Sequence, residues 1–290
     1  MGDHYTGSAV CNHCSYPLHG LDIGGACPEC GRAVLASLRG DSLEHASPDY
    51  LQTLRQGITI AIAFGVAGMV TGFVTEIAPG IVGRLGPGSR QAGLWIGWLM
   101  STFAAAGFIR FTTVDPGMGE SEQPRSARRL ARFGVALMVC GDLSYAIAGM
   151  VPGAPVRLSI PATPAGFSLT LPWLAMAVSG LILWAGFLFY FFQGLRYTEW
   201  LFSRARDPDG VRASRRYMIL LPMIAVFGTC LCGLGPFVAK ILHWNLLWTL
   251  RTRITHAIDV QRFERIVVEN VARGGQFPPP PQDSGQGRRP

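Results

Sequence analysis

The stretch Leu130–Val151, LARFGVALMVCGDLSYAIAGMV, most constrains what this chain can fold into. It stays apolar for about six helical turns, and about 20 such residues are enough for a helix to cross the hydrocarbon core of a membrane. Only 15% of the 290 residues are charged, below the roughly 25% usual in soluble domains. Five more apolar runs lie at Ile58–Ala78, Ala92–Phe111, Leu171–Phe192, Tyr217–Cys232 and Pro236–Leu250. We therefore predict an all-α polytopic membrane helical bundle of about six transmembrane helices.

The last two runs are separated only by GLGP at 233–236, so they could also form a single kinked helix and leave five spans. Glycine with proline is typical of a turn, which favours two spans. With six spans, Arg251 and Arg253 lie on the same side as the arginine-rich segments 125–129 and 193–216, as the positive-inside rule requires. We therefore predict a cytoplasmic N-terminus and a location in the inner membrane of a bacterium.

Two CxxC pairs precede the first apolar run, at Cys11–Cys14 and Cys27–Cys30. Two such pairs that meet across a short hairpin give a tetrahedral zinc site with four thiolate ligands. Two disulfides would need an oxidising compartment, and a thioredoxin-like redox pair would need a βαβ unit for which this segment is too short. We therefore predict a ribbon folded around a structural Zn²⁺, with Cys11, Cys14, Cys27 and Cys30 as the ligands.

The run CNHCSYPLHGL at Cys11–Leu21, followed by CPECG at Cys27–Gly31, resembles the N-terminal zinc ribbon of uncharacterised multi-pass membrane proteins of planctomycete genomes. Within it, Tyr16, Leu18 and Gly20 match the pattern CxxCxYxLxGL of those proteins. The resemblance implies a zinc ribbon ahead of several hydrophobic helices. It implies no particular activity.

Three of the ionisable residues inside the predicted spans stand out. Asp142 lies about 15 Å beyond Arg132 along a helix, near the bilayer midplane, where a carboxylate is costly and by default marks a functional site. Lys240 and His243 share one face of the last span. One hypothesis is an intramembrane polar site of Asp142, Lys240 and His243, in which the carboxylate pairs with the ammonium directly or through His243. Alternatively, Asp142 is neutral and bonds to Ser144, to Tyr145 or to a neighbouring helix, and Lys240 reaches the outer interface.

The first two runs each contain a GxxxG pattern, at Gly68–Gly72 and Gly93–Gly97. Glycines at this spacing let two helix backbones approach closely. We interpret both patterns as packing between neighbouring helices of the bundle, and not as a dimer interface.

Composition divides the chain into four segments. Residues 1–46 form the cytoplasmic zinc ribbon and its linker, and 47–250 form the transmembrane domain, with a helix start at Ser47-Pro48-Asp49. Residues 251–273 have apolar residues at helical spacing between charges and predict a cytoplasmic amphipathic helix. The Pro-rich segment 274–290 is predicted to be disordered.

The sequence contains no HExxH, Walker, GxSxG or GxGxxG motif, which disfavours an enzyme without excluding one. The ribbon segment 1–40 has no basic stripe, so we do not expect nucleic-acid binding. Our first hypothesis is a non-enzymatic binding or scaffolding role in the lipid bilayer, in which the ribbon or the C-terminal helix docks a cytosolic protein. The alternative is a small-solute transporter or intramembrane enzyme that uses Asp142 with Lys240 and His243.

Overall fold

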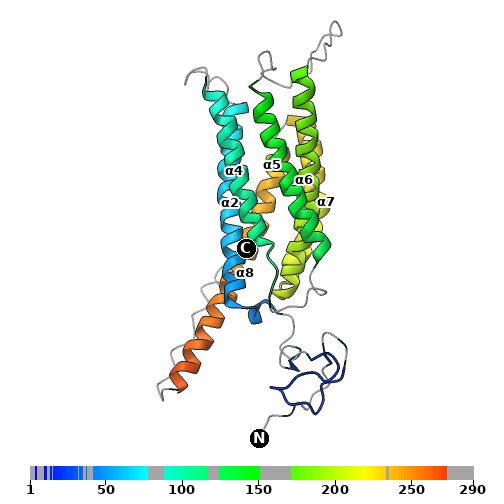
Figure 1. Ribbon diagram of the computed structural model, residues 1–290, viewed down its shortest axis with the longest axis vertical. Coiled ribbons are helices and arrows are strands. Elements are labelled where there is room, and N and C mark those ends of the chain that lie inside the picture. Colours follow the sequence, from blue (N-terminus) through cyan, green and yellow to red (C-terminus); the bar gives the residue numbers. More distant parts are fainter. Residues whose placement is uncertain are drawn as a thin grey trace.

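Long helices follow one another along the described part of the chain, after a short 3-10 helix (Figure 1). The computed structural model describes residues 4, 10, 11, 14, 16–31, 33, 34, 37, 42–77, 88–116, 124–150, 171–232 and 235–272. The elements are η1 (Leu43–His45), α2 (Pro48–Ile77), α4 (Ser89–Phe111), α5 (Arg125–Ala148), α6 (Leu171–Arg204), α7 (Pro208–Cys232) and α8 (Gly235–Ala272). The described N-terminal residues form only isolated β-bridges. The Pro-rich segment 274–290 lies outside the described residues.

Four helices of the described residues are long and apolar enough to cross a membrane: Pro48–Thr75, Gln91–Phe111, Arg125–Ala148 and Leu174–Arg204. Helices α7 and α8 run beside them and carry arginines in the half nearest the N-terminal segment, which shortens their apolar part. Large apolar side chains cover the outside of the bundle, as contact with lipid requires; Leu181 and Ile219 are each 70% exposed. The predicted fold class, a helical membrane bundle with a small four-cysteine segment, is confirmed.

The long helices form a closed ring. Each packs against the next helix in the chain, and the last, α8, packs against the first, α2. Successive helices run in opposite directions, so that α2, α5 and α7 begin at the end where the cysteine segment lies (Figure 1). Helix α8 is continuous from Gly235 to Ala272, and its second half extends beyond the bundle at that same end. We call this end the head end.

Two antiparallel hairpins, α2–α4 and α5–α6, have the most extensive contacts and pack in the same way. A Cβ atom built on Gly57 would lie 2.8 Å from the carbonyl oxygen of Gly107, and one built on Gly134 would lie 2.8 Å from the carbonyl oxygen of Gly186. Real Cβ atoms do not approach a backbone oxygen so closely, so each position requires glycine. Close backbone approach at small residues is a common way to pack helices in lipid.

The GxxxG patterns only partly serve as expected. A Cβ atom on Gly68 would lie 3.3 Å from the Cβ atom of Met100, and Gly93 faces Thr75, so these two glycines do pack against a neighbouring helix. A Cβ atom on Gly72 or Gly97 would have nothing within 4 Å. The interpretation of both GxxxG patterns as packing sites is therefore wrong for half of the four glycines, because open space faces them.

The start of α2 at the head end is held by local capping and by a contact with α8. Helix α2 begins at Pro48, where the Tyr50 backbone N–H donates a hydrogen bond of 3.3 Å to the Ser47 hydroxyl. The side-chain amide of Gln261, on α8, donates to the carbonyl oxygens of Glu44 and Ala46 at 2.6 and 2.8 Å. Helix α8 therefore fixes the linker that joins the cysteine segment to α2.

Candidate functional sites

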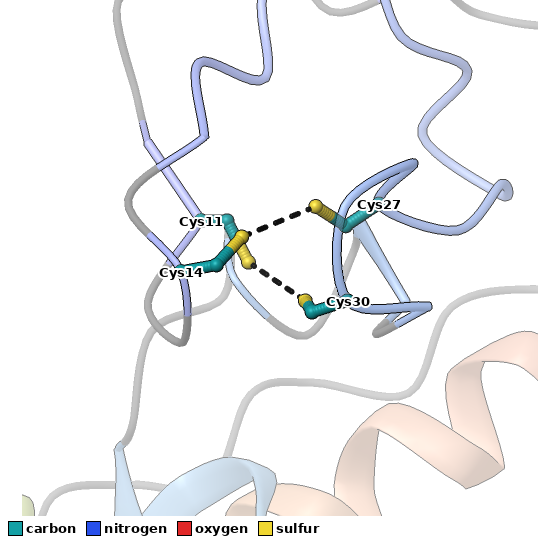
Figure 2. A group of neighbouring side chains, drawn as sticks. All are labelled: Cys11, Cys14, Cys27 and Cys30. Carbon is teal, nitrogen blue, oxygen red and sulfur yellow. Dashed lines mark hydrogen bonds between the residues drawn. The ribbon is translucent and has the colours of Figure 1, made fainter.

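The four predicted ligand cysteines come together in the N-terminal segment (Figure 2). All four sulfur atoms lie within 4.8 Å of one another. Cys11 and Cys14 approach from one loop and Cys27 and Cys30 from another, with Sγ–Sγ distances of 3.7 Å for Cys11–Cys30 and 3.6 Å for Cys14–Cys27. All four cysteines are free thiols, and no disulfide joins them in the described part of the chain.

Backbone turns bring each CxxC pair into this arrangement. Gly31 adopts a φ of +71°, which favours glycine, and its N–H donates to the Cys27 carbonyl at 2.8 Å. In the first loop, the Cys11 N–H donates to the Tyr16 carbonyl at 2.7 Å. Beneath the cluster, Leu18 and Val34 are completely buried against the cysteines. This is a very small core, so the segment needs a further source of stability.

The geometry of the sulfurs fits a tetrahedral metal ion. With a Zn–S distance of about 2.3 Å, the edges of an ideal tetrahedron of sulfurs are about 3.8 Å long. The two closest Sγ–Sγ distances, 3.6 and 3.7 Å, agree with this value. The Tyr16 backbone lowers the pKa of the Cys14 thiol, but desolvation and the neighbouring thiols outweigh it and raise that pKa to about 12. Four thiols this close therefore need a cation to deprotonate together.

The sequence analysis missed Ser37, whose hydroxyl donates to the Cys11 sulfur at 3.6 Å. Hydrogen bonds to ligand atoms fix their orientation and tune a metal site. A single serine several residues beyond a CxxC pair gives no signal by which this role could be found. His19 is exposed and lies outside the cluster, and His13 lies outside the described residues.

A second candidate site lies inside the bundle. Asp142 from α5 and Lys240 and His243 from α8 all line one cavity of about 420 Å³. The cavity is lined by residues of α2, α4, α5, α6 and α8. The structure therefore brings the three intramembrane residues of the sequence analysis to one place.

Asp142 and Lys240 act on each other through space. Each is among the charges that influence the other, but no direct ion pair joins them among the described residues. Ser101, on α4, lines the same cavity and lies near enough to influence the Asp142 carboxyl group. The Ser144 hydroxyl donates instead to the Cys140 carbonyl at 2.8 Å, so it is not the donor for Asp142. The two side chains therefore line one cavity without a direct ion pair between them.

His243 is 1% exposed, and neither of its ring nitrogens has a hydrogen-bond partner. Its ring packs against Tyr190 and Phe191, with centroid distances of 5.4 and 5.0 Å. Trp98 also lines this cavity, and its indole N–H is buried without a partner. Buried polar groups without partners are rare in proteins, and each one calls for an explanation.

Glycine makes the room for this cavity. Gly72 of α2 and Gly97 of α4 line it, and no atom lies within 4 Å of a Cβ built on either one. The sequence analysis identified neither the cavity nor Ser101 and Trp98 as parts of it, because a helical serine or tryptophan carries no signal for the side on which its neighbours lie.

The head end contains two ion pairs that the sequence analysis did not single out. Arg204, at the end of α6, binds Asp115, after α4, with 2.9 Å between Nη2 and Oδ2; these side chains are 6% and 2% exposed. Arg253, in the middle of α8, binds Asp207 at 2.8 Å, and its side chain is half exposed. Each pair joins a helix to the segment that follows another helix, so both are structural contacts.

Comparisons of the chain with protein-family models, with curated proteins and with solved structures found no match.

Proposed function

We propose that the chain is a six-span protein of a bacterial inner membrane that displays a zinc ribbon to the cytosol, where the ribbon docks a protein partner. The membrane bundle and the four-cysteine cluster are the framework of this proposal. The partner-docking role is carried by one observation. The cluster organises a small segment whose linker is bonded to the membrane bundle, and no catalytic motif accompanies it.

Zinc is the metal that best suits this cluster. Four thiolates in a closed tetrahedral set are typical of structural zinc sites, whereas a catalytic zinc site keeps a position open for water or substrate. The Sγ–Sγ distances of 3.6 and 3.7 Å support the tetrahedral set. Zinc would supply the folding energy that Leu18 and Val34 alone cannot. The planctomycete-type membrane proteins with a CxxC…CPECG ribbon are the family that we propose for this chain.

Successive helices run in alternating directions, which supports six spans, with the segments before the first span and after the last span both in the cytoplasm. Arg125, Arg204 and Arg212 belong to the ends of α5, α6 and α7 that lie at the head end, and Arg253 lies in the middle of α8, whose second half extends beyond that end. An excess of arginine marks the cytoplasmic side. Ile219, exposed on α7, supports contact of that helix with lipid. A two-sided topology reporter fused after residue 273 tests six spans against five. With the N-terminus in the cytoplasm, a cytoplasmic reporter requires an even number of spans.

Metal analysis of the purified full chain tests the ribbon. We expect one zinc ion per chain, and none in Cys27→Ser, while Cys27→Ser still resists extraction of the membranes by alkaline carbonate. Cys140→Ser is the matched control, because Cys140 is an exposed cysteine of α5 outside the cluster. Iron in place of zinc, or a Cys27→Ser chain with its full zinc content, would contradict the assignment.

Photo-crosslinking in cells tests the docking role. A benzophenone amino acid replaces Val10, which is 49% exposed on the ribbon, or Leu181, which is 70% exposed on α6. We expect a discrete protein adduct from position 10 that disappears when Cys27→Ser is added, and no such adduct from position 181. An adduct from position 10 that persists without the metal site, or identical adducts from both positions, would refute docking through the folded ribbon.

A further inference from the structure

The intramembrane cavity presents two opposite charges that are not joined to each other. Asp142 reaches it from α5 and Lys240 from α8, without a direct ion pair between them in the described part of the chain. Charges within a membrane bundle are costly and are normally paired or bound to a ligand. A molecule that carries both a cationic and an anionic group can satisfy both residues at once, whereas a simple cation or a simple anion leaves one of them unsatisfied.

We infer that this cavity binds a small zwitterion, with the cationic group of the ligand at Asp142, its anionic group at Lys240, and an apolar body between the helices. This inference is independent of the zinc ribbon and of its docking role. It assigns to the bundle a binding site of its own.

Two further residues of the cavity carry buried polar atoms without partners. His243 is 1% exposed with both ring nitrogens unpaired, and it follows Lys240 by one helical turn. Trp98 lines the same cavity, and its indole N–H is also unpaired. These nitrogens expose almost no surface to the cavity, so each ring has to rotate before it can donate to the oxygens of a carboxylate or phosphate.

The size and walls of the cavity define the rest of the ligand. Sites for small molecules usually have volumes of roughly 300–1,000 Å³, apolar walls and a few polar groups. This cavity, of about 420 Å³, falls within that range, and Phe64, Phe108, Phe237 and Trp244 supply aromatic walls. The apolar body of the ligand is therefore the size of a large amino-acid side chain, and stacking on aromatic rings favours an aromatic or branched group.

Two glycines of the helices leave space for the cavity. Gly72 and Gly97 line the cavity, and a Cβ atom on either would meet nothing within 4 Å. Larger residues would fit the backbone at both positions and would fill the cavity. The small residues here therefore keep space open, in contrast to Gly134 and Gly186, which bring two helices together.

Two sources offer this chemistry: a free amphipathic amino acid and the headgroup of an ethanolamine lipid, which joins an ammonium to a phosphate. The first experiment measures the binding of L-phenylalanine to the full chain in nanodiscs of phosphatidylglycerol by isothermal titration calorimetry. Phenethylamine lacks the anionic group and N-acetyl-L-phenylalanine lacks the cationic group. We expect L-phenylalanine to bind about tenfold or more tightly than either analogue, because each analogue leaves one buried charge unpaired.

Charge variants then assign the two ends. Asp142→Asn should weaken the binding of L-phenylalanine about tenfold or more and leave the binding of N-acetyl-L-phenylalanine unchanged. Lys240→Met should weaken the binding of L-phenylalanine by a similar factor and leave the binding of phenethylamine unchanged. Asp259→Asn is the matched control, because Asp259 belongs to the part of α8 beyond the cavity. Equal affinity for all three molecules, or equal effects of Asp142→Asn and Asp259→Asn, would overturn the inference.

The lipid source is tested by native mass spectrometry of the chain from nanodiscs that mix phosphatidylethanolamine with phosphatidylglycerol. Retention of one ethanolamine lipid, lost in Asp142→Asn and absent with phosphatidylglycerol alone, identifies the headgroup as the ligand. If neither L-phenylalanine nor the ethanolamine lipid binds, the inference is wrong. Because the charge variants could also misfold, Gly97→Leu provides a second test: it should abolish binding, whereas Gly180→Leu, at a glycine that is open but outside the cavity, should not.

Discussion

The same substitution should have opposite effects at two glycines of the bundle. Gly134→Ala places a Cβ atom 2.5 Å from the backbone nitrogen of Tyr190 and 2.8 Å from the carbonyl oxygen of Gly186. Gly97→Ala places a Cβ atom where nothing lies within 4 Å. Both positions are inside helices, so the gain in helix propensity is the same for both. The difference between the two variants therefore isolates the contact of α5 with α6.

The expected free energies of unfolding follow from this geometry. Replacing a helical glycine by alanine stabilises by up to about 1 kcal/mol. Overpacking costs about 1–3 kcal/mol, and the upper value applies to Gly134 because backbone atoms cannot move aside as a flexible side chain can. Gly134→Ala should thus lose about 2 kcal/mol and Gly97→Ala should gain about 1 kcal/mol, a difference of about 3 kcal/mol between them.

Reversible unfolding in mixed micelles of increasing sodium dodecyl sulfate content measures these values, with tryptophan fluorescence as the signal. Gly180→Ala is the control, because its Cβ atom also meets nothing within 4 Å but lies outside the cavity. It should behave as Gly97→Ala does. If Gly134→Ala is as stable as either of these variants, α5 and α6 do not approach closely at this glycine, and the packing argument fails.

Three further predictions concern the head end and the metal site. Asp115→Ala should lose about 3–5 kcal/mol of unfolding free energy, because it leaves the Arg204 guanidinium buried without its carboxylate, and Asp115→Leu combined with Arg204→Met should recover most of that loss in the same assay. Gln261→Ala removes two hydrogen bonds to the linker, worth about 1 kcal/mol each, and should speed amide exchange in the linker but not in the core of α5. Zinc affinity, measured against a chromogenic chelator, should fall continuously as the pH is lowered below about 12, the value to which the pKa of the Cys14 thiol is raised, because binding displaces protons from the thiols. An affinity independent of pH, or a Cys27→Ser chain that binds as tightly, would contradict thiolate ligation.

The cysteine cluster shows what a local pattern can predict. The two residues between the cysteines of each pair set the turn, and Gly31 provides the positive φ that the second turn needs, so the sequence contains most of the geometry. The helices are predictable for a similar reason, because an apolar run of membrane length has to satisfy its backbone hydrogen bonds internally. Ser37 could not be predicted, because its contact with Cys11 depends on how the chain returns to the cluster.

Asp142, Lys240 and His243 were predictable as residues but not as a site. An ionisable group at membrane depth is costly, which identifies it from the sequence alone. The way in which the charges face each other depends on which helices are neighbours, and α8 adjoins α2 only because the ring closes. The sequence suggested a pair, direct or through His243, whereas in the structure both side chains line one cavity without a direct ion pair.

The glycines explain why that cavity could not be predicted. Within the hairpins, Gly57 and Gly134 face backbone atoms of the adjacent helix, and their helices pack closely. Gly72 and Gly97 lie on the same helical hairpin as Gly57, but they face the space between that hairpin and the rest of the ring. A glycine next to the backbone of another helix lets the two helices pack closely, whereas a glycine that faces open space leaves room for a cavity. The sequence carries the same residue in both cases, so only the arrangement of the helices decides where the bundle is tight and where it can hold a ligand.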